Sequence, residues 1–461
     1  MKKSTLAIGV IAILGLGYVG IAWHTGNVIE NELDNTLYNI TKQVNNLQNG
    51  FKIKIAHSND EKGIFSTKTH IKIIGRPAGI FDPITLYDDD IIIHHGPFPL
   101  AALKQGTFSP QMAWLEYQST QQSNPDLWKL VGNQPFVNGH INLSYSDNLT
   151  INMTTQPIVL SDEDLIFQFL EGKLELGQIN YKVSGNLSYE TPSVSIVIDN
   201  LNYKRHDGDE IKLKNLKVNN KIDDQNYSFE AHNSIDDLFI NLKDYTNKQT
   251  IELKNFVMGY KLANKTTGLE GDMEIAVDAV NYGKQQMGNG TLELNVQGLD
   301  KSFIDNSTQI SWLLDSVDSS NITNTKINFK KVHWHNASGD FNFNALIDVD
   351  NLNQMTIYDQ DIDKVNQFSM NLEAPFAVIA RFMSQIEAPE SEQITDNQLQ
   401  KTNNNLQLMA QMALSTSPLV NFKKGNTSGI FSELDYSKSK DQVTINGNKI
   451  SKQEFLNNLN F

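Results

Sequence analysis

The chain has 461 residues with 53 acidic and 38 basic side chains, a net charge of −15 and an isoelectric point near 5.1. This balance excludes a surface-wide basic field of the kind that holds phosphate backbones, so nucleic acid is not expected as a partner. Cysteine is absent, which excludes disulfides, thiolate metal sites and cysteine nucleophiles and agrees with export that needs no oxidative folding.

An uncharged apolar run opens the chain. Lys2 and Lys3 precede about 20 residues without a charge, enough helix at ~1.5 Å per residue to cross a ~30 Å hydrocarbon core. The stretch Leu6–Trp23 exceeds the ~7–15 apolar residues of a signal peptide, which favours an uncleaved anchor over cleavage before Trp23. The leading lysines place the N-terminus in the cytoplasm and the remainder outside.

The same run contains Gly15-Leu-Gly17-Tyr-Val-Gly20, which matches the spelling of a dinucleotide-binding turn. Such a site also needs a preceding strand, a following helix, and a second strand ending in an acidic residue roughly 20 positions on. The acidic residues at that distance, Glu30 and Asp34, fall inside a helical repeat instead. We therefore expect the glycines to belong to a membrane helix and no nucleotide cofactor to bind.

A second helix is predicted over residues 26–50. Leu33, Leu37, Ile40, Val44 and Leu47 follow 4-3 spacing over about two heptads, which is short of the three or four that identify a coiled coil. The helix either packs on its own domain or forms a membrane-proximal contact between two copies.

From residue 51 onward, alternation replaces helical periodicity. Ile141, Leu143 and Tyr145 share one strand face, and Leu149, Ile151 and Met153 repeat the pattern, so each strand has only one apolar face and the sheet should be antiparallel. In a second pattern, apolar residues occupy alternate positions and then move to the other set of positions after an extra polar residue, the pivot. This change predicts a bulge or tight corner at the pivot. It occurs at Ile196–Leu201, Ile211–Leu216, Ile251–Phe256 and Ile347–Leu352, with a variant at Ile327–Val332.

Few helices interrupt the strands. Gln309–Val317 and Ala374–Ile386 are predicted helices, a loop is expected over 387–405, and a further helix over 406–414. Asn446-Gly447 predicts a tight hairpin, and Ser451 with Glu454 forms a capping box for a last helix that carries Phe455 and Leu459.

These elements define a mainly β (α+β) chain. A cytoplasmic and transmembrane segment at 1–25 is followed by a membrane-proximal helix at 26–50 and an elongated, mostly antiparallel β-sheet domain at 51–461, in one or two lobes.

Two histidine pairs are the candidate metal or catalytic groups. His94 and His95 follow Asp88–Asp90 but would point to opposite faces of one strand, and His333 and His335 share a face without a third ligand of known proximity. No hydrolase, zincin, Walker or calcium-loop motif is present in the sequence. We therefore expect these residues to be structural, with no metal, cofactor or catalytic residue assigned.

Three segments resemble the YdgA-like family of bacterial envelope proteins, a domain family of unknown function. They are Trp23–Gly26 at the end of the anchor, Ile93–Leu103 with its H-G-P-F-P core, and Thr444–Ser451 before the last helix. The resemblance implies a single-pass inner-membrane protein with a periplasmic domain in a Gram-negative bacterium, and self-association as an option; it supplies no catalytic residues.

The expected function is that of a non-enzymatic binding or scaffold protein of the cell envelope, with a lipid or an envelope protein as partner. In a lipid-handling version, the apolar strand faces line a groove; otherwise they pack on each other. The alternative is an envelope hydrolase with a His and carboxylate site.

Overall fold

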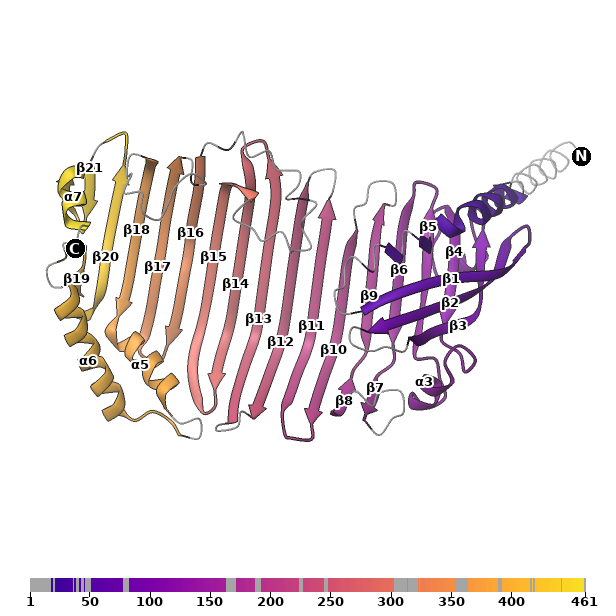
Figure 1. Ribbon diagram of the computed structural model, residues 1–461, viewed down its shortest axis with the longest axis horizontal. Helices are drawn as coiled ribbons and strands as arrows, with labels where there is room; N and C mark the ends of the chain where they lie inside the picture. The colour runs from indigo at the N-terminus through magenta and orange to yellow at the C-terminus, as the bar shows by residue number, and fades with distance from the viewer. Residues whose placement is uncertain are drawn as a thin grey trace, which may run out of the picture. The chain divides into compact units, whose positions relative to one another are not determined.

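The computed structural model describes most of the chain from Tyr18 onward (Figure 1). The described ranges are 18–19, 21–35, 37–38, 41–42, 45, 51–77, 83–162, 171–186, 192–223, 227–243, 248–301, 313, 322, 324–350, 352, 364–388, 392–414, 417, 419–440 and 442–459. The chain divides into two compact units, Met1–Asp199 (unit 1) and Asn200–Phe461 (unit 2).

Unit 1 is built on antiparallel strands that pair in the order β1-β2-β3-β4-β5-β6-β9-β10, of which β10 runs past Asp199 into unit 2. β7 and β8 form a hairpin, and β8 also pairs with β10. The strands are β1 (Phe51–Lys62), β2 (Ser66–Pro77), β3 (Ile84–His95), β4 (Gln111–Gln118), β5 (Val137–Ser144), β6 (Asn148–Thr155), β7 (Ile158–Ser161), β8 (Gly172–Leu176), β9 (Ile179–Asn186) and β10 (Ser193–Arg205), and the short helices are α2 (Leu100–Lys104) and α3 (Pro125–Leu130). The predicted alternation around residues 141–153 is confirmed as the β5–β6 hairpin.

The N-terminal helix packs on this sheet. Residues 21–35 are helical, and Ile29, Leu33 and Leu37 contact a cluster that includes the buried Ile71 and Ile93 of β2 and β3. The first part of the predicted heptad stripe thus covers its own domain, while Ile40, Val44 and Leu47 lie outside the described residues. The glycine pattern at 15–20 also lies outside them. Within the described part, no helix is long and apolar enough to cross a membrane.

Unit 2 is an antiparallel meander in which the strands from β11 to β18 pair in chain order, each strand from β12 onward with the one before it, followed by β20, β21 and β22, with β19 on β20. Its strands are β11 (Glu210–Asp223), β12 (Ser228–Lys243), β13 (Lys248–Lys265), β14 (Gly268–Tyr282), β15 (Gln285–Leu299), β16 (Asn324–Asn336), β17 (Gly339–Asp350), β18 (Val365–Pro375), β19 (Asn421–Lys424), β20 (Thr427–Ser437), β21 (Gln442–Ile445) and β22 (Asn448–Ser451), and its helices are α5 (Phe376–Glu387), α6 (Asp396–Leu414) and α7 (Lys452–Leu459). The expected mostly antiparallel, β-rich fold is confirmed.

The polar pivots are real corners in part of the sheet. Asn215 and Asn255 have φ of 52° and 48°, and each amide donates 2.8 Å to the carboxylate of Asp236 or Asp278 on the next strand. Asn tolerates this left-handed conformation, so the strand can change parity while its apolar side chains stay on one face. In β16 the switch appears as a register shift between Phe329 and Val332.

Other pivots and helices turn out differently. At Asn200 φ is not positive, although Asp199 and Asn200 are both exposed, as a change of parity requires, and Asn351 lies outside the described residues. Of the predicted helix at 309–317 only Leu313 is described; it is helical and fully buried.

The C-terminal predictions fare better, apart from one loop. α5 confirms the helix predicted over 374–386, and the Asn446-Gly447 turn and the final capped helix are also confirmed. The loop predicted over 387–405 is wrong because α6 already begins at Asp396. Thr395 and Gln398 form a capping box there. The backbone N–H of Gln398 donates to the Thr395 hydroxyl, and the backbone N–H of Thr395 donates to the Gln398 side-chain oxygen.

Candidate functional site

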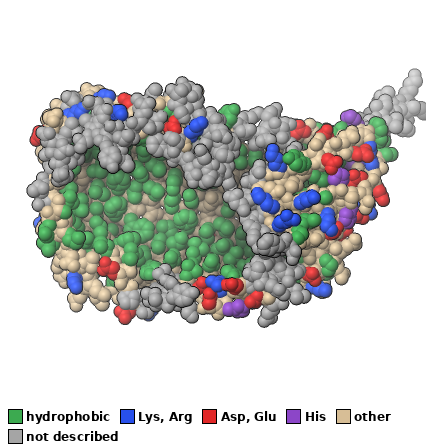
Figure 2. Space-filling model, in the orientation of Figure 1, with side chains coloured by type: hydrophobic (Ala, Val, Ile, Leu, Met, Phe, Trp, Pro, Cys, Tyr) green, Lys and Arg blue, Asp and Glu red, His purple; other side chains and the backbone are tan. Residues whose placement is uncertain are grey.

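One face of the unit 2 sheet is apolar across β12–β17 (Figure 2). Its side chains alternate with polar ones along each strand, and most of them are half-buried, not enclosed. The face includes Ile240 of β12, Ile251 and Leu253 of β13, Ile275, Val277 and Val280 of β14, Leu292 of β15, Val332 and Trp334 of β16, and Phe341 and Phe343 of β17.

A groove of about 650 Å³ lies where this face meets α5. The helix contributes Val378, Ile379, Phe382 and Ile386 to the lining, opposite side chains from β13 to β17. The polar groups Asn281 and His333 at the groove already bond to Glu252 and Asn342. The volume falls in the range of small-molecule sites, and the surface presented is carbon.

Hydrogen bonds to the sheet hold α5 in place. The buried Asn336 amide donates 3.0 Å to the Val378 carbonyl, and Gln385 donates 2.8 Å to the Gln286 carbonyl. α5 also buries apolar side chains, among them Val378 and Ala380, while Phe382 at 39 % and Ile386 at 53 % remain exposed. The helix thus forms one wall of an open groove.

Trp334 forms the floor of the groove next to this wall. Its ring meets Phe382 edge-on at 6.1 Å, and its indole nitrogen donates 3.2 Å to the Met287 carbonyl. A Cβ at Gly290 would lie 2.5 Å from the ring, so only glycine at this position allows the indole to lie flat across β15.

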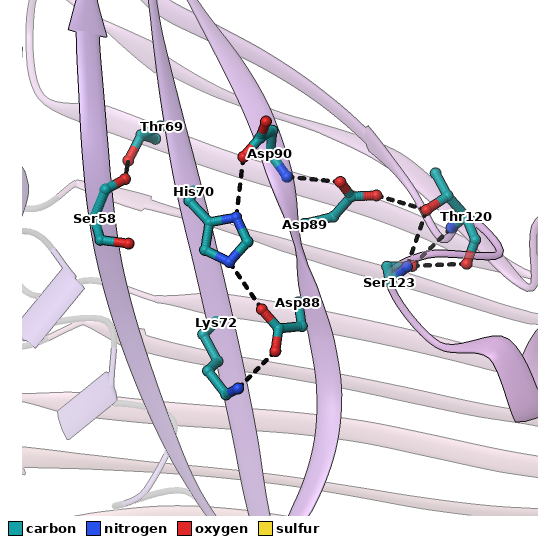
Figure 3. Close-up of polar contacts among 9 residues, drawn as sticks. All are labelled: Ser58, Thr69, His70, Lys72, Asp88, Asp89, Asp90, Thr120 and Ser123. Carbon is teal, nitrogen blue, oxygen red and sulfur yellow. Dashed lines mark hydrogen bonds and ion pairs between the residues drawn. The ribbon is translucent and has the colours of Figure 1, made fainter.

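The strongest polar cluster lies in unit 1, between β2 and β3 (Figure 3). His70 is held through both ring nitrogens, at 3.0 Å by Asp90 and at 2.8 Å by Asp88, while Lys68 and Lys72 pair with the same carboxylates. The hydrogen bond that the His70 ring donates to Asp90 is the largest cause that raises the pKa of His70, and the bond to Asp88 is the second. A histidine with both nitrogens engaged lacks the open nitrogen of a general base. The cluster is suited to linking two strands.

Sequence reasoning missed His70, although the signal was available. Lys68, His70 and Lys72 alternate along one strand, and Asp88 and Asp90 alternate along the next, so paired register brings opposite charges together. Asp89 points the other way and accepts a hydrogen bond from Thr120 (Figure 3).

His94 and His95 lie on β3 and are not brought together at one site. His95 is 1 % exposed and its Nε2 lies 2.9 Å from the Thr67 hydroxyl, and burial lowers the pKa of both imidazoles. The N-terminal helix crosses directly over His95, with Gly26 against its ring and Ala22 against Gly96. Two of the segments that carried the family resemblance, Trp23–Gly26 and Ile93–Leu103, therefore contact each other.

His333 and His335 do share a neighbour that the sequence did not reveal. Asp340, across the β16–β17 hairpin, lies 2.8 Å from His335 Nδ1 and 3.6 Å from His333 Nε2. Asn342 holds the other nitrogen of His333. In the described part of the chain no group of three or more His, Asp or Glu has metal-site geometry.

Comparison with known proteins places the chain in a family. The family described as "Bacterial protein of unknown function (DUF945)" matches residues 1–310. The chain belongs to this family. Two of the three resembling segments fall inside that range. No solved structure matches the chain.

Two proteins of Escherichia coli (strain K12) are similar to this family member. Protein YdgA is 25 % identical over 314 residues, which cover 65 % of this chain and 60 % of YdgA. The uncharacterized protein YihF is 19 % identical over an alignment of 491 positions that covers 99 % of this chain and 98 % of YihF. The predicted resemblance to a YdgA-like family is confirmed.

Proposed function

We propose that this protein is an inner-membrane-anchored periplasmic protein without catalytic activity, and that its unit 2 sheet binds acyl chains of a lipid. The single observation that carries lipid binding is the half-exposed apolar face with its α5-walled groove of about 650 Å³. The sequence run Leu6–Trp23 supports the anchor.

The groove suits a lipid better than a peptide. Each strand from β12 to β17 is paired on both sides, so its backbone groups are engaged within the sheet. An extended peptide seated on the groove would bury its own N–H and C=O groups with no partner, at a cost of about 1–3 kcal/mol each. An acyl chain has no such groups.

A hydrolase is the weaker proposal. His70 has carboxylates on both nitrogens, and His94 and His95 lie in a different unit from His333 and His335. None of these histidines is paired with a nucleophile in a described cavity.

In-cell photocrosslinking tests lipid binding. Phe382, in the groove, is replaced by p-benzoylphenylalanine in the full-length chain, and Phe239 serves as the matched control because it lies on the opposite, polar face beneath Lys212. After irradiation and purification, mass spectrometry should find a lipid adduct at position 382 and none at 239. Equal labelling at both positions, or a protein adduct at 382, would contradict lipid binding.

A further inference from the structure

Exposed apolar side chains occur near the first described residues of the N-terminal helix in unit 1. Ile64 and Phe65 occupy the β1–β2 turn, Phe98 lies between β3 and α2, and Leu100 is the first residue of α2, with exposures of 47, 46, 39 and 71 %. Ile21 of the helix is 46 % exposed. We call these five residues the apolar collar. None of them belongs to a described buried cluster.

Tyr18 fixes the collar against the helix. Its ring stacks on Phe65 with centroids 5.7 Å apart, and its hydroxyl donates 3.0 Å to the Phe98 carbonyl. One turn later, Ala22 is fully buried against Gly96. These contacts place Phe65, Phe98 and the neighbouring collar residues beside helix positions 18–22.

The length of the apolar run sets the depth of those positions. The run Leu6–Trp23 comprises about 18 residues, or ~27 Å of helix, close to the ~30 Å hydrocarbon thickness. Without Tyr18–Trp23 only about 12 residues and ~18 Å remain, too short to span. An anchor that crosses the bilayer must include positions 18–22, and the collar has the same depth.

We infer that the apolar collar is seated in the lipid leaflet that faces the domain, so the domain lies against the membrane and does not hang from a free tether. This inference rests on the proposed anchoring. The composition fits the interface, where aromatic rings are favoured. Lys104, one turn after Leu100 and exposed, supplies a cation that lipid phosphates would attract.

The absence of cysteine makes the test clean, because any introduced cysteine is unique. Leu100→Cys carries an environment-sensitive nitrobenzoxadiazole dye, and Val159→Cys, at 50 % exposure on β7 of the same unit, is the control. The full-length chain is reconstituted into vesicles of phosphatidylcholine and phosphatidylglycerol, with and without doxyl-labelled lipid. The emission of the dye at residue 100 should shift to the blue, and doxyl lipid should quench it about twofold or more, as expected ~5–10 Å inside the headgroup boundary. The emission of the dye at residue 159 should not change.

Each outcome decides between the two proposals. Vesicles that float with the protein but leave position 100 unquenched overturn the collar inference and leave the anchor standing. Protein that does not float overturns the anchor, and the collar inference with it. A blue shift in lipid-free detergent that grows with protein concentration assigns the patch to a second copy of the chain and also overturns the inference. Ile64→Cys repeats the measurement from the other loop, in case one variant folds poorly, and it leaves the Tyr18–Phe65 stack intact.

Discussion

Gly26→Ala should loosen the N-terminal helix although it replaces glycine in a helix interior. At an ordinary position this change stabilises by about 1 kcal/mol because alanine loses less backbone entropy. At Gly26 the new Cβ would lie 2.6 Å from Nδ1 and 2.7 Å from Cε1 of His95. That ring is 1 % exposed and bonded to Thr67, so it cannot withdraw. Overpacking costs about 1–3 kcal/mol, which leaves a net loss of about 0–2 kcal/mol.

The measurement is local hydrogen exchange of helix residues 21–35 in the full-length protein, because global unfolding of two units would mix their contributions. His95→Ala supplies the control background, since it removes the ring that the new methyl group meets. In that background Gly26→Ala should stabilise the helix by up to about 1 kcal/mol, the ordinary value.

The decisive result is that Gly26→Ala lowers the opening free energy of the helix when His95 is present and raises it in the His95→Ala background. If Gly26→Ala changed the opening free energy by the same amount with and without His95, the two residues would not be coupled. The proposed contact between the helix and β3 would then be wrong.

Three further predictions concern the two sheets. Asn255→Ala should lower the local opening free energy of β13 by about 1–2 kcal/mol, measured by hydrogen exchange of its amides, whereas Asn255→Gly, which keeps the left-handed φ of 48°, should lose less. The NMR pKa of His70 should exceed 6.5 and fall in Asp90→Asn; because the folded pKa is raised, its stabilising contribution is complete below pH 6.5 and disappears as the pH rises through the folded pKa. Ile275→Asp should reduce lipid capture in the groove roughly tenfold, a loss of about 1.4 kcal/mol, while Glu274→Gln on the opposite face should not, with circular dichroism confirming that both variants are folded.

Most of the β architecture could be predicted because its signal is local. Alternation along Ile251–Phe256 gives the apolar face, and the polar Asn255 gives the corner. At Asn200 the same pattern produces no left-handed residue, so the pattern alone does not fix the backbone conformation. Thr395 and Gln398 have the spacing of a capping box and thus indicate where α6 begins, but the polar composition of the segment favoured a loop.

The sites were less predictable because they depend on register. Whether His70 meets Asp88 and Asp90, or Asp340 meets His335, follows from which residues face each other across strands. The groove depends on α5 folding back over β15–β17, which Asn336 and Gln385 determine through backbone bonds to distant segments. A single sequence contains these residues but not their pairing.

The order of strands in unit 2 has a consequence for how the sheet forms. Each strand from β12 to β18 pairs with the strand immediately before it. A chain delivered N-terminus first can therefore add every new strand to an edge that already exists, at the small entropy cost of closing a hairpin. The same nearest-neighbour plan allows evolution to insert or delete a hairpin, widening or narrowing the apolar face by ~4.8 Å per strand and leaving the other pairings intact. The breadth of the apolar face can thus vary between relatives without a change of fold.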